Sequence, residues 1–225
     1  MTTETLKRAA AERAAAEVAD GMTVGLGSGT TAAFVIEALA RRVAQGLRIV
    51  CVPTSERTAN LARRLGLALV GLTDRPVDID IDGADQVERA SLVLVKGGGG
   101  SLLREKIVAL ASRRMVVAVD ETKLVDRLGP GTIVPVEIEP WGAAATLVRL
   151  ANVGAAARLR YGGTRPFVTD GGHVIADCTF DGILDPRALE TRLNSIAGVI
   201  ECGLFVGLAS EVVVGREHAV EVIAR

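Results

Sequence analysis

Short apolar runs alternate with segments of helical periodicity between Glu4 and Val119, and this alternation restricts the fold more than any other feature. Strands are expected at 22–26, 47–52, 67–71, 77–81, 91–95 and 115–119, and helices at 4–19, 32–43, 56–65 and 102–114. Strands that alternate with helices at this spacing form βαβ units, in which the strands run parallel. The sequence therefore predicts an α/β fold with a mostly parallel sheet flanked by helices.

The pattern changes after Pro130. A strand is expected at 133–138, and Pro135 predicts that it lies at a sheet edge, because proline lacks the N–H that a second neighbour would need. Further elements are expected as a helix at 143–151, short antiparallel strands at 158–161, 167–169 and 173–179, a helix opened by Asp185-Pro186, and strands at 199–206 and 211–214. We expect residues 130–202 to form a smaller α+β domain, and residues 1–129 with 203–225 to form the main domain.

Composition narrows the classes of partner. The chain has 225 residues, a net charge of −1 and 3% aromatic residues. It therefore has neither the basic field nor the stacking surface that nucleic acid or an anionic membrane requires. No apolar run approaches the roughly 18 residues of a membrane span, and the charged N-terminal segment does not resemble a signal peptide. Three scattered cysteines without a CxxC pair indicate a cytoplasmic protein with reduced thiols.

The stretch 77–106 carries the polar groups of a predicted active site. Asp82-Gly83-Ala84-Asp85 follows one apolar run, Lys96 and four glycines follow the next, and Glu105 stands near the start of the following helix. In open α/β sheets, ligands bind at the carboxyl ends of the strands. We therefore predict proton-transfer chemistry on a small phosphorylated molecule.

The glycine run at 97–100 is the most specific part of this stretch. Consecutive glycines cost conformational entropy, so they are useful where the backbone must approach a ligand closely. Their N–H groups, together with Lys96, are suited to hold an oxyanion. The alternative is a flexible linker, but linkers rarely stand between a buried strand and a helix.

The acids of this stretch have simpler interpretations. Asp82 and Asp85 are suited to cap a turn or a helix. The alternation of Asp78, Asp80 and Asp82 with apolar residues makes one strand face acidic, so Mg²⁺ is a further alternative. Lys96 would compete for these carboxylates, and the two histidines show no zinc-binding spacing. We therefore expect no metal. Taken alone, Glu105 and Lys123 are typical of solvated surface charges.

The segment Gly25–Thr31 predicts a phosphate site between a strand and a helix. It offers backbone N–H groups, hydroxyls and a helix N-terminus. Thr30 replaces a glycine of the dinucleotide-binding pattern, and no acid follows about 20 residues later, so nicotinamide binding is not expected. An ordinary tight turn capped by threonine is the alternative.

Together these segments resemble the ribose-5-phosphate isomerase type A family over nearly the whole chain. The resemblance lies in GLGSGTTAAFVI, Thr54-Ser55-Glu56, DIDGAD, KGGGGSLLREK, VDETK, VTDGGHVIAD, ILDP and GVIECGLF. It implies a Rossmann-like domain with a small α+β (ferredoxin-like) lid, a homodimer or homotetramer, and catalysis of ribose 5-phosphate isomerisation without a cofactor.

The resemblance also implies roles for individual residues. Glu105 becomes the general base, which replaces its interpretation as a surface charge, while Asp82, Asp85 and Lys96 act on the sugar oxygens. The implied binding residues are Ser28, Gly29, Thr30, Thr31, Lys7 and Lys123 for the phosphate, with Gly83, Ala84, Gly97, Gly98 and Gly99 around the sugar. Leu103 and Ser101 depart from the family pattern without removing a required group.

Two other classes remain as alternatives. A sugar-phosphate-sensing regulator would keep the phosphate loop but needs no base, and it usually carries a DNA-binding segment, for which the early first helix is expected to leave no room. A relative of the acyl-CoA transferases would need a glutamate nucleophile in a different motif and a longer chain.

Overall fold

The computed structural model describes residues 2–225 and divides the chain into two compact units. The first unit contains the residues up to Ala84, Arg104–Leu124 and Gly207–Arg225, and the second contains Asp85–Leu103 and Val125–Val206. This division differs from the expected one chiefly in the segment Asp85–Leu103. Its strands pair with a strand of the second unit, as described below.

The first unit is built on a six-stranded sheet in the order β16-β15-β6-β3-β1-β2. Its strands are β1 (Thr23–Leu26), β2 (Val50–Pro53), β3 (Ile79–Asp82), β6 (Met115–Asp120), β15 (Ala209–Gly215) and β16 (Val220–Ala224). All neighbours pair in parallel except β16, which is antiparallel to β15 at one edge. The prediction of an α/β fold with a mostly parallel sheet is confirmed.

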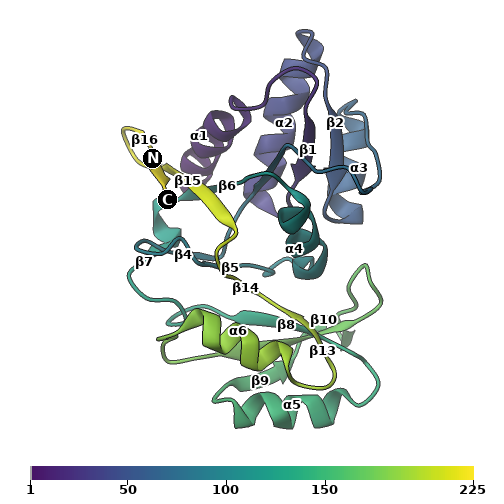
Figure 1. The fold of residues 1–225 in the computed structure, drawn as a ribbon, viewed down its shortest axis with the longest axis vertical. Helices are drawn as coiled ribbons and strands as arrows, with labels where there is room; N and C mark the ends of the chain where they lie inside the picture. The colour runs from purple at the N-terminus through teal and green to yellow at the C-terminus, as the bar shows by residue number, and fades with distance from the viewer. Residues whose placement is uncertain (1) are drawn as a thin grey trace. The chain divides into compact units, whose positions relative to one another are not determined.

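Helices cover this sheet (Figure 1). They are α1 (Thr3–Ala15), α2 (Thr30–Ala44), α3 (Glu56–Arg64) and α4 (Leu102–Ala111), of which α4 begins in the second unit. Alanines of α1 pack with Val35 and Leu39 of α2 against Ile79 and Ile81 of β3. Because side chains alternate across a strand, Asp80 and Asp82 must face the other side of the sheet. The acidic strand face predicted from the sequence is therefore real, and its Asp80 and Asp82 are buried.

The second unit contains an antiparallel sheet in the order β13-β8-β12-β9. Its elements are β8 (Val134–Ile138), α5 (Ala143–Asn152), β9 (Ala156–Leu159), β12 (Val174–Thr179), α6 (Pro186–Asn194) and β13 (Val199–Cys202), beside a short hairpin of β10 (Tyr161–Gly162) and β11 (Arg165–Pro166). One apolar core holds α5, α6 and the sheet together.

The expectation that Pro135 marks an edge strand is wrong. β8 has β12 on one side and β13 on the other. The proline is tolerated because the pairing with β13 ends at Val136 opposite Cys202, so no ladder donor is needed at Pro135 on that side.

Residues 91–95 do not form a strand of the main sheet, so this prediction is also wrong. β5 (Leu94–Val95) pairs antiparallel with β4 (Gln86–Glu88) and β14 (Leu204–Phe205) in a small sheet that also includes β7 (Leu124–Val125). Residues 67–71 likewise make only an isolated bridge between Leu69 and Cys51. Among the described residues, no helix has the length and apolar character needed to span a membrane.

Candidate active site

Gly25 of β1 and Gly27, which follows this strand, make room for the acids of β3. The strands pair with Gly25 opposite Asp80, and Gly27 follows two residues later, on the same face. A Cβ atom on Gly25 would lie 2.6 Å from Asp80 Oδ1, and one on Gly27 would overlap the carboxylate of Asp82. The glycines that resemble a nucleotide-binding pattern therefore serve the buried carboxylates.

Asp82 is held by backbone N–H groups from two segments. Its Oδ1 accepts hydrogen bonds from the N–H of Gly83 at 2.7 Å and from the N–H of Ser28 at 3.1 Å. Ser28 belongs to the predicted phosphate loop, so this loop and the candidate acid are directly connected. Gly83 also lies close to the loop, since a Cβ there would be 3.6 Å from Thr31 Cβ.

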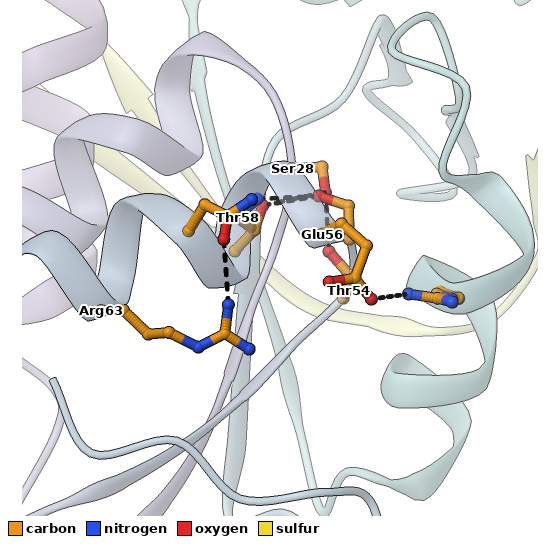
Figure 2. Close-up of polar contacts among 8 residues, drawn as sticks. Ser28, Thr54, Glu56, Thr58 and Arg63 are labelled. Atoms are coloured by element: carbon orange, nitrogen blue, oxygen red, sulfur yellow. Dashed lines mark hydrogen bonds and ion pairs between the residues drawn. The ribbon is translucent and has the colours of Figure 1, made fainter. Parts of the chain in front are cut away.

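A cluster of four hydroxyl groups fixes the same loop (Figure 2). Ser28 Oγ lies 2.9 Å from both Thr54 Oγ1 and Ser55 Oγ and 3.1 Å from Thr58 Oγ1. The hydroxyl of Thr54 donates to the carbonyl of Leu26 at 2.9 Å, and that of Thr58 donates to the carbonyl of Gly27 at 3.0 Å. Sequence reasoning noted Thr54 and Ser55 but missed Thr58. Three hydroxyls at the start of one helix were the available clue.

The remaining residues of the loop open helix α2. Gly29 precedes the helix with φ of 99°, a conformation that favours glycine, and no side chain caps this helix start. Lys7 of α1 reaches the loop, and its Nζ donates to Thr30 Oγ1 at 3.4 Å. A helix N-terminus with a nearby ammonium group is suited to bind phosphate. The structure thus brings Lys7 together with Thr30.

Glu105 lies in the first turn of α4 and is only 3% exposed. The interpretation of the isolated residue as a surface charge is therefore wrong. Its neighbour Arg104 makes an exposed ion pair with Glu56 at 3.1 Å (Figure 2), and Lys106 is buried.

Lys123 ends a short 3-10 helix, Glu121–Lys123, after strand β6. The buried side chain of Asp120 caps this turn by accepting a hydrogen bond from Thr122 N at 3.1 Å. Lys123 is half-buried. Asp120 was not singled out from the sequence.

Asp85, Lys96 and the glycine run belong to the second unit. The N–H of Gly98 donates to Asp85 Oδ2 at 2.8 Å. Lys96 is 3% exposed, and its Nζ lies 5.4 Å from the centre of the Phe205 ring. Gly97 has φ of 95°, and a Cβ there would lie 2.7 Å from Leu102 Cβ, so the run needs glycine both for its conformation and for space.

Arg160 contacts the glycine run and was missed by sequence reasoning. Its Nη1 donates to the carbonyl of Gly98 at 3.0 Å and to that of Gly97 at 3.3 Å. The same guanidinium donates from Nε to both carboxylate oxygens of Asp177, at 3.0 Å and 3.2 Å. In the sequence, Arg160 is indistinguishable from the arginines around it.

In the part of the chain that the structure describes, no three or more His, Cys, Asp or Glu side chains cluster as metal ligands would. The absence of a metal remains a prediction.

Comparisons with known proteins agree with one another. Residues 50–219 match the family model described as ribose 5-phosphate isomerase A (phosphoriboisomerase A). Ribose-5-phosphate isomerase A from Gloeobacter violaceus is 51% identical over 224 residues, which cover 99% of this chain and 97% of that protein. The protein of the same name from Agrobacterium fabrum is 47% identical, with 97% of each chain covered.

Solved structures give the same result. Ribose 5-phosphate isomerase A from Methanocaldococcus jannaschii superposes with a TM-score of 0.95 at 38% identity and full coverage of both chains. A D-ribose-5-phosphate isomerase in complex with phospho-erythronic acid has a TM-score of 0.96, also at 38% identity and full coverage of both chains.

A parallel sheet with buried carboxylates, beside a loop that opens a helix, defines an α/β enzyme, and the two solved structures described above are isomerases. The chain belongs to the ribose-5-phosphate isomerase A family.

Proposed function

We propose that this chain interconverts D-ribose 5-phosphate and D-ribulose 5-phosphate, as an aldose–ketose isomerase of the non-oxidative pentose phosphate pathway. Family membership supports the substrate. The observation that carries the chemistry is the burial of Glu105 at the start of α4, because a carboxylate shielded from water is suited to act as a base.

In this proposal Glu105 removes the proton from C2 of the opened sugar and returns it to C1. The intermediate is an enediolate, which carries negative charge on the oxygens of C1 and C2. A positioned base of this kind contributes about 10²–10⁴ in rate. The reaction moves one hydrogen between neighbouring carbons and is redox-neutral overall.

Lys96 and the amides of Gly97 and Gly99 oppose the charge of the enediolate, while the Gly98 N–H holds Asp85. A buried ammonium and fixed N–H groups are worth more here than in water, since they need no reorganisation as the charge develops. The burial of Lys96 supports this role.

Asp82 and Asp85 move protons on the sugar oxygens, during ring opening and during exchange between O1 and O2. Asp82 is held in place by the two N–H groups that its Oδ1 accepts. Asp85 is oriented by the N–H of Gly98. Gly83 and Ala84 connect the two aspartates and line the sugar.

The phosphate is bound at the start of α2 by Gly29, Thr30 and Thr31, with Lys7 and Lys123 supplying positive charge. The contact between Lys7 and Thr30 supports this assignment. Ser28 belongs to the same loop. The N–H of Ser28 donates to Asp82, and its hydroxyl belongs to the hydroxyl cluster. We therefore propose that Ser28 positions the loop.

The family resemblance further supports a homodimer or homotetramer and action in the cytoplasm, where the free thiols of Cys51, Cys178 and Cys202 stay reduced. One structural neighbour was solved with phospho-erythronic acid. This phosphorylated four-carbon acid bears a carboxylate where the enediolate bears its charge, which is consistent with the proposed intermediate.

A spectrophotometric assay of the purified protein with ribose 5-phosphate in excess EDTA tests the function. We expect full activity, because transfer of a carbon-bound proton by a carboxylate needs no metal. Absence of ketose product, with or without added Mg²⁺ or Zn²⁺, would contradict the proposed function. Activity only with added metal would contradict the metal-free mechanism.

A further inference from the structure

The guanidinium of Arg160 is fixed between an aspartate and the glycine run, within the second unit. Arg160 directly follows β9, and Asp177 lies on the neighbouring strand β12. The two side chains are 14% and 12% exposed. Arginine can make such contacts with one planar group, since its five N–H donors point in fixed directions.

The contacts of Arg160 determine which way two peptide groups face. None of the described peptide bonds is cis, and in a trans peptide the C=O and N–H point in opposite directions. The carbonyls of Gly97 and Gly98 both accept from Arg160 Nη1. The N–H groups of Gly98 and Gly99, which belong to the same two peptides, must therefore point away from the guanidinium.

The hydrogen-bond partner of the Gly98 N–H shows which group lies on the side away from the guanidinium. The N–H of Gly98 donates to Asp85, the candidate proton carrier. The N–H of Gly100 is also engaged, with the carbonyl of Gly97 at 2.9 Å. Of the two amides that Arg160 orients, the N–H of Gly99 is therefore the one left to meet a substrate oxygen beside Asp85.

We propose that Arg160, held by Asp177, is a positioning residue that aims the Gly99 N–H at the oxyanion of the enediolate. The proposal rests on the proposed isomerase function and adds to it a residue outside the family motifs given above. Glycine peptides rotate easily, so without the guanidinium these two peptides lose their fixed direction. The positive charge also polarises both carbonyls, which strengthens the opposite N–H groups as donors.

The test compares Arg160→Lys and Arg160→Gln with a matched control, Arg158→Lys. Lysine keeps the charge but cannot contact two carbonyls and a carboxylate at once. Arg158 lies on β9 two residues earlier and is exposed. The measurements are kcat and KM for ribose 5-phosphate, the inhibition constants of phospho-erythronic acid and of inorganic phosphate, and the melting temperature.

In both Arg160 variants we expect kcat to fall about 10- to 100-fold, somewhat less than for removal of an oxyanion donor. KM should stay within about threefold, because the misdirected amide matters mainly in the transition state. Affinity for phospho-erythronic acid should fall with kcat, whereas inhibition by inorganic phosphate should not change. Arg158→Lys should match the wild type in every measurement.

Two results would overturn the proposal: a kcat within about twofold of the wild type in both Arg160 variants, or equal losses of affinity for phospho-erythronic acid and for inorganic phosphate. If the Arg160 variants do not fold, the Asp177→Asn variant provides the test. It keeps the guanidinium of Arg160 but weakens the contact that holds it in place. A selective fall in kcat supports the proposal, and an unchanged kcat overturns it. A wild-type protein inactive on ribose 5-phosphate would instead overturn the proposed function.

Discussion

At the scale of single residues, glycine and aspartate are matched across two strands of the parallel sheet. Gly25 and Gly27 lack the side chains that would occupy the space of Asp80 and Asp82. A buried carboxylate needs both space and donors, and the second need is met by the N–H groups that hold Asp82. The geometry of this acid therefore depends on residues that carry no chemistry themselves.

Replacement of Gly27 by alanine tests this match. The added methyl group would overlap the Asp82 carboxylate and push it from its N–H donors. We expect kcat to fall at least about 100-fold, since the acid is displaced, and the free energy of unfolding to fall by about 1–3 kcal/mol. Gly71→Ala is the control, because a Cβ there has no neighbour within 4 Å. A wild-type kcat in the Gly27 variant would show that catalysis does not depend on the position of the Asp82 carboxylate.

Replacement of Thr58 by valine tests the hydroxyl cluster. The change leaves the Gly27 carbonyl without its hydroxyl donor and removes one contact of Ser28. A buried group left unsatisfied costs about 1–3 kcal/mol. We expect inhibition by inorganic phosphate to weaken about 5- to 20-fold, as part of this cost falls on loop geometry.

Thr58→Ser, which keeps the hydroxyl, should restore phosphate binding. Thr146→Val is the matched control, a buried helical threonine of the second unit. An unchanged inhibition constant of inorganic phosphate in Thr58→Val would show that phosphate binding does not depend on the hydroxyl cluster.

At the scale of elements, the strands of the parallel sheet were predictable because short apolar runs alternate with segments of helical periodicity. The strand expected at 91–95 was placed in the wrong sheet, since an apolar run does not reveal its partner. β5 pairs with β14, which lies more than a hundred residues later in the chain. Arg160 was missed for the same reason, because only the pairing of β9 with β12 brings it to Asp177.

The fold class was predicted from the residues themselves and is confirmed, whereas the candidate site was predicted through family resemblance. Taken alone, Glu105 was interpreted as a surface charge, which is wrong, because its burial depends on how α4 packs. The roles of all the candidate site residues, Glu105 among them, stay predictions until variants are measured.

Two strands carry cysteines whose reactivity follows from burial. Burial raises the pKa of Cys51 on β2 to about 12, and burial, with a smaller contribution from Asp177, raises the pKa of Cys178 on β12 to about 12. Both thiols are therefore protonated at pH 8, and the thiolate is the reactive form. We expect slow modification by a thiol reagent in the native protein and rapid reaction of all three cysteines in denaturant. Rapid labelling of either residue in the native protein would contradict this.

At the scale of the whole molecule, the candidate residues are distributed over both compact units. Asp82 and Glu105 belong to the first unit, whereas Asp85 and Lys96 belong to the second. Only Gly83 and Ala84 separate the two aspartates in the sequence, so the chain passes between units within the DGAD motif. The central step of the proposed mechanism belongs to one carboxylate, that of Glu105.

The most direct test is the turnover of Glu105→Gln, measured together with its binding of ribose 5-phosphate. Glutamine keeps the size of the side chain but cannot accept the C2 proton, so kcat should fall by at least about 10²–10⁴. Binding should stay within a few fold of the wild type, and Glu190→Gln, on a helix of the second unit, should have normal turnover. A kcat near the wild-type value in Glu105→Gln would contradict the assignment of Glu105 as the base.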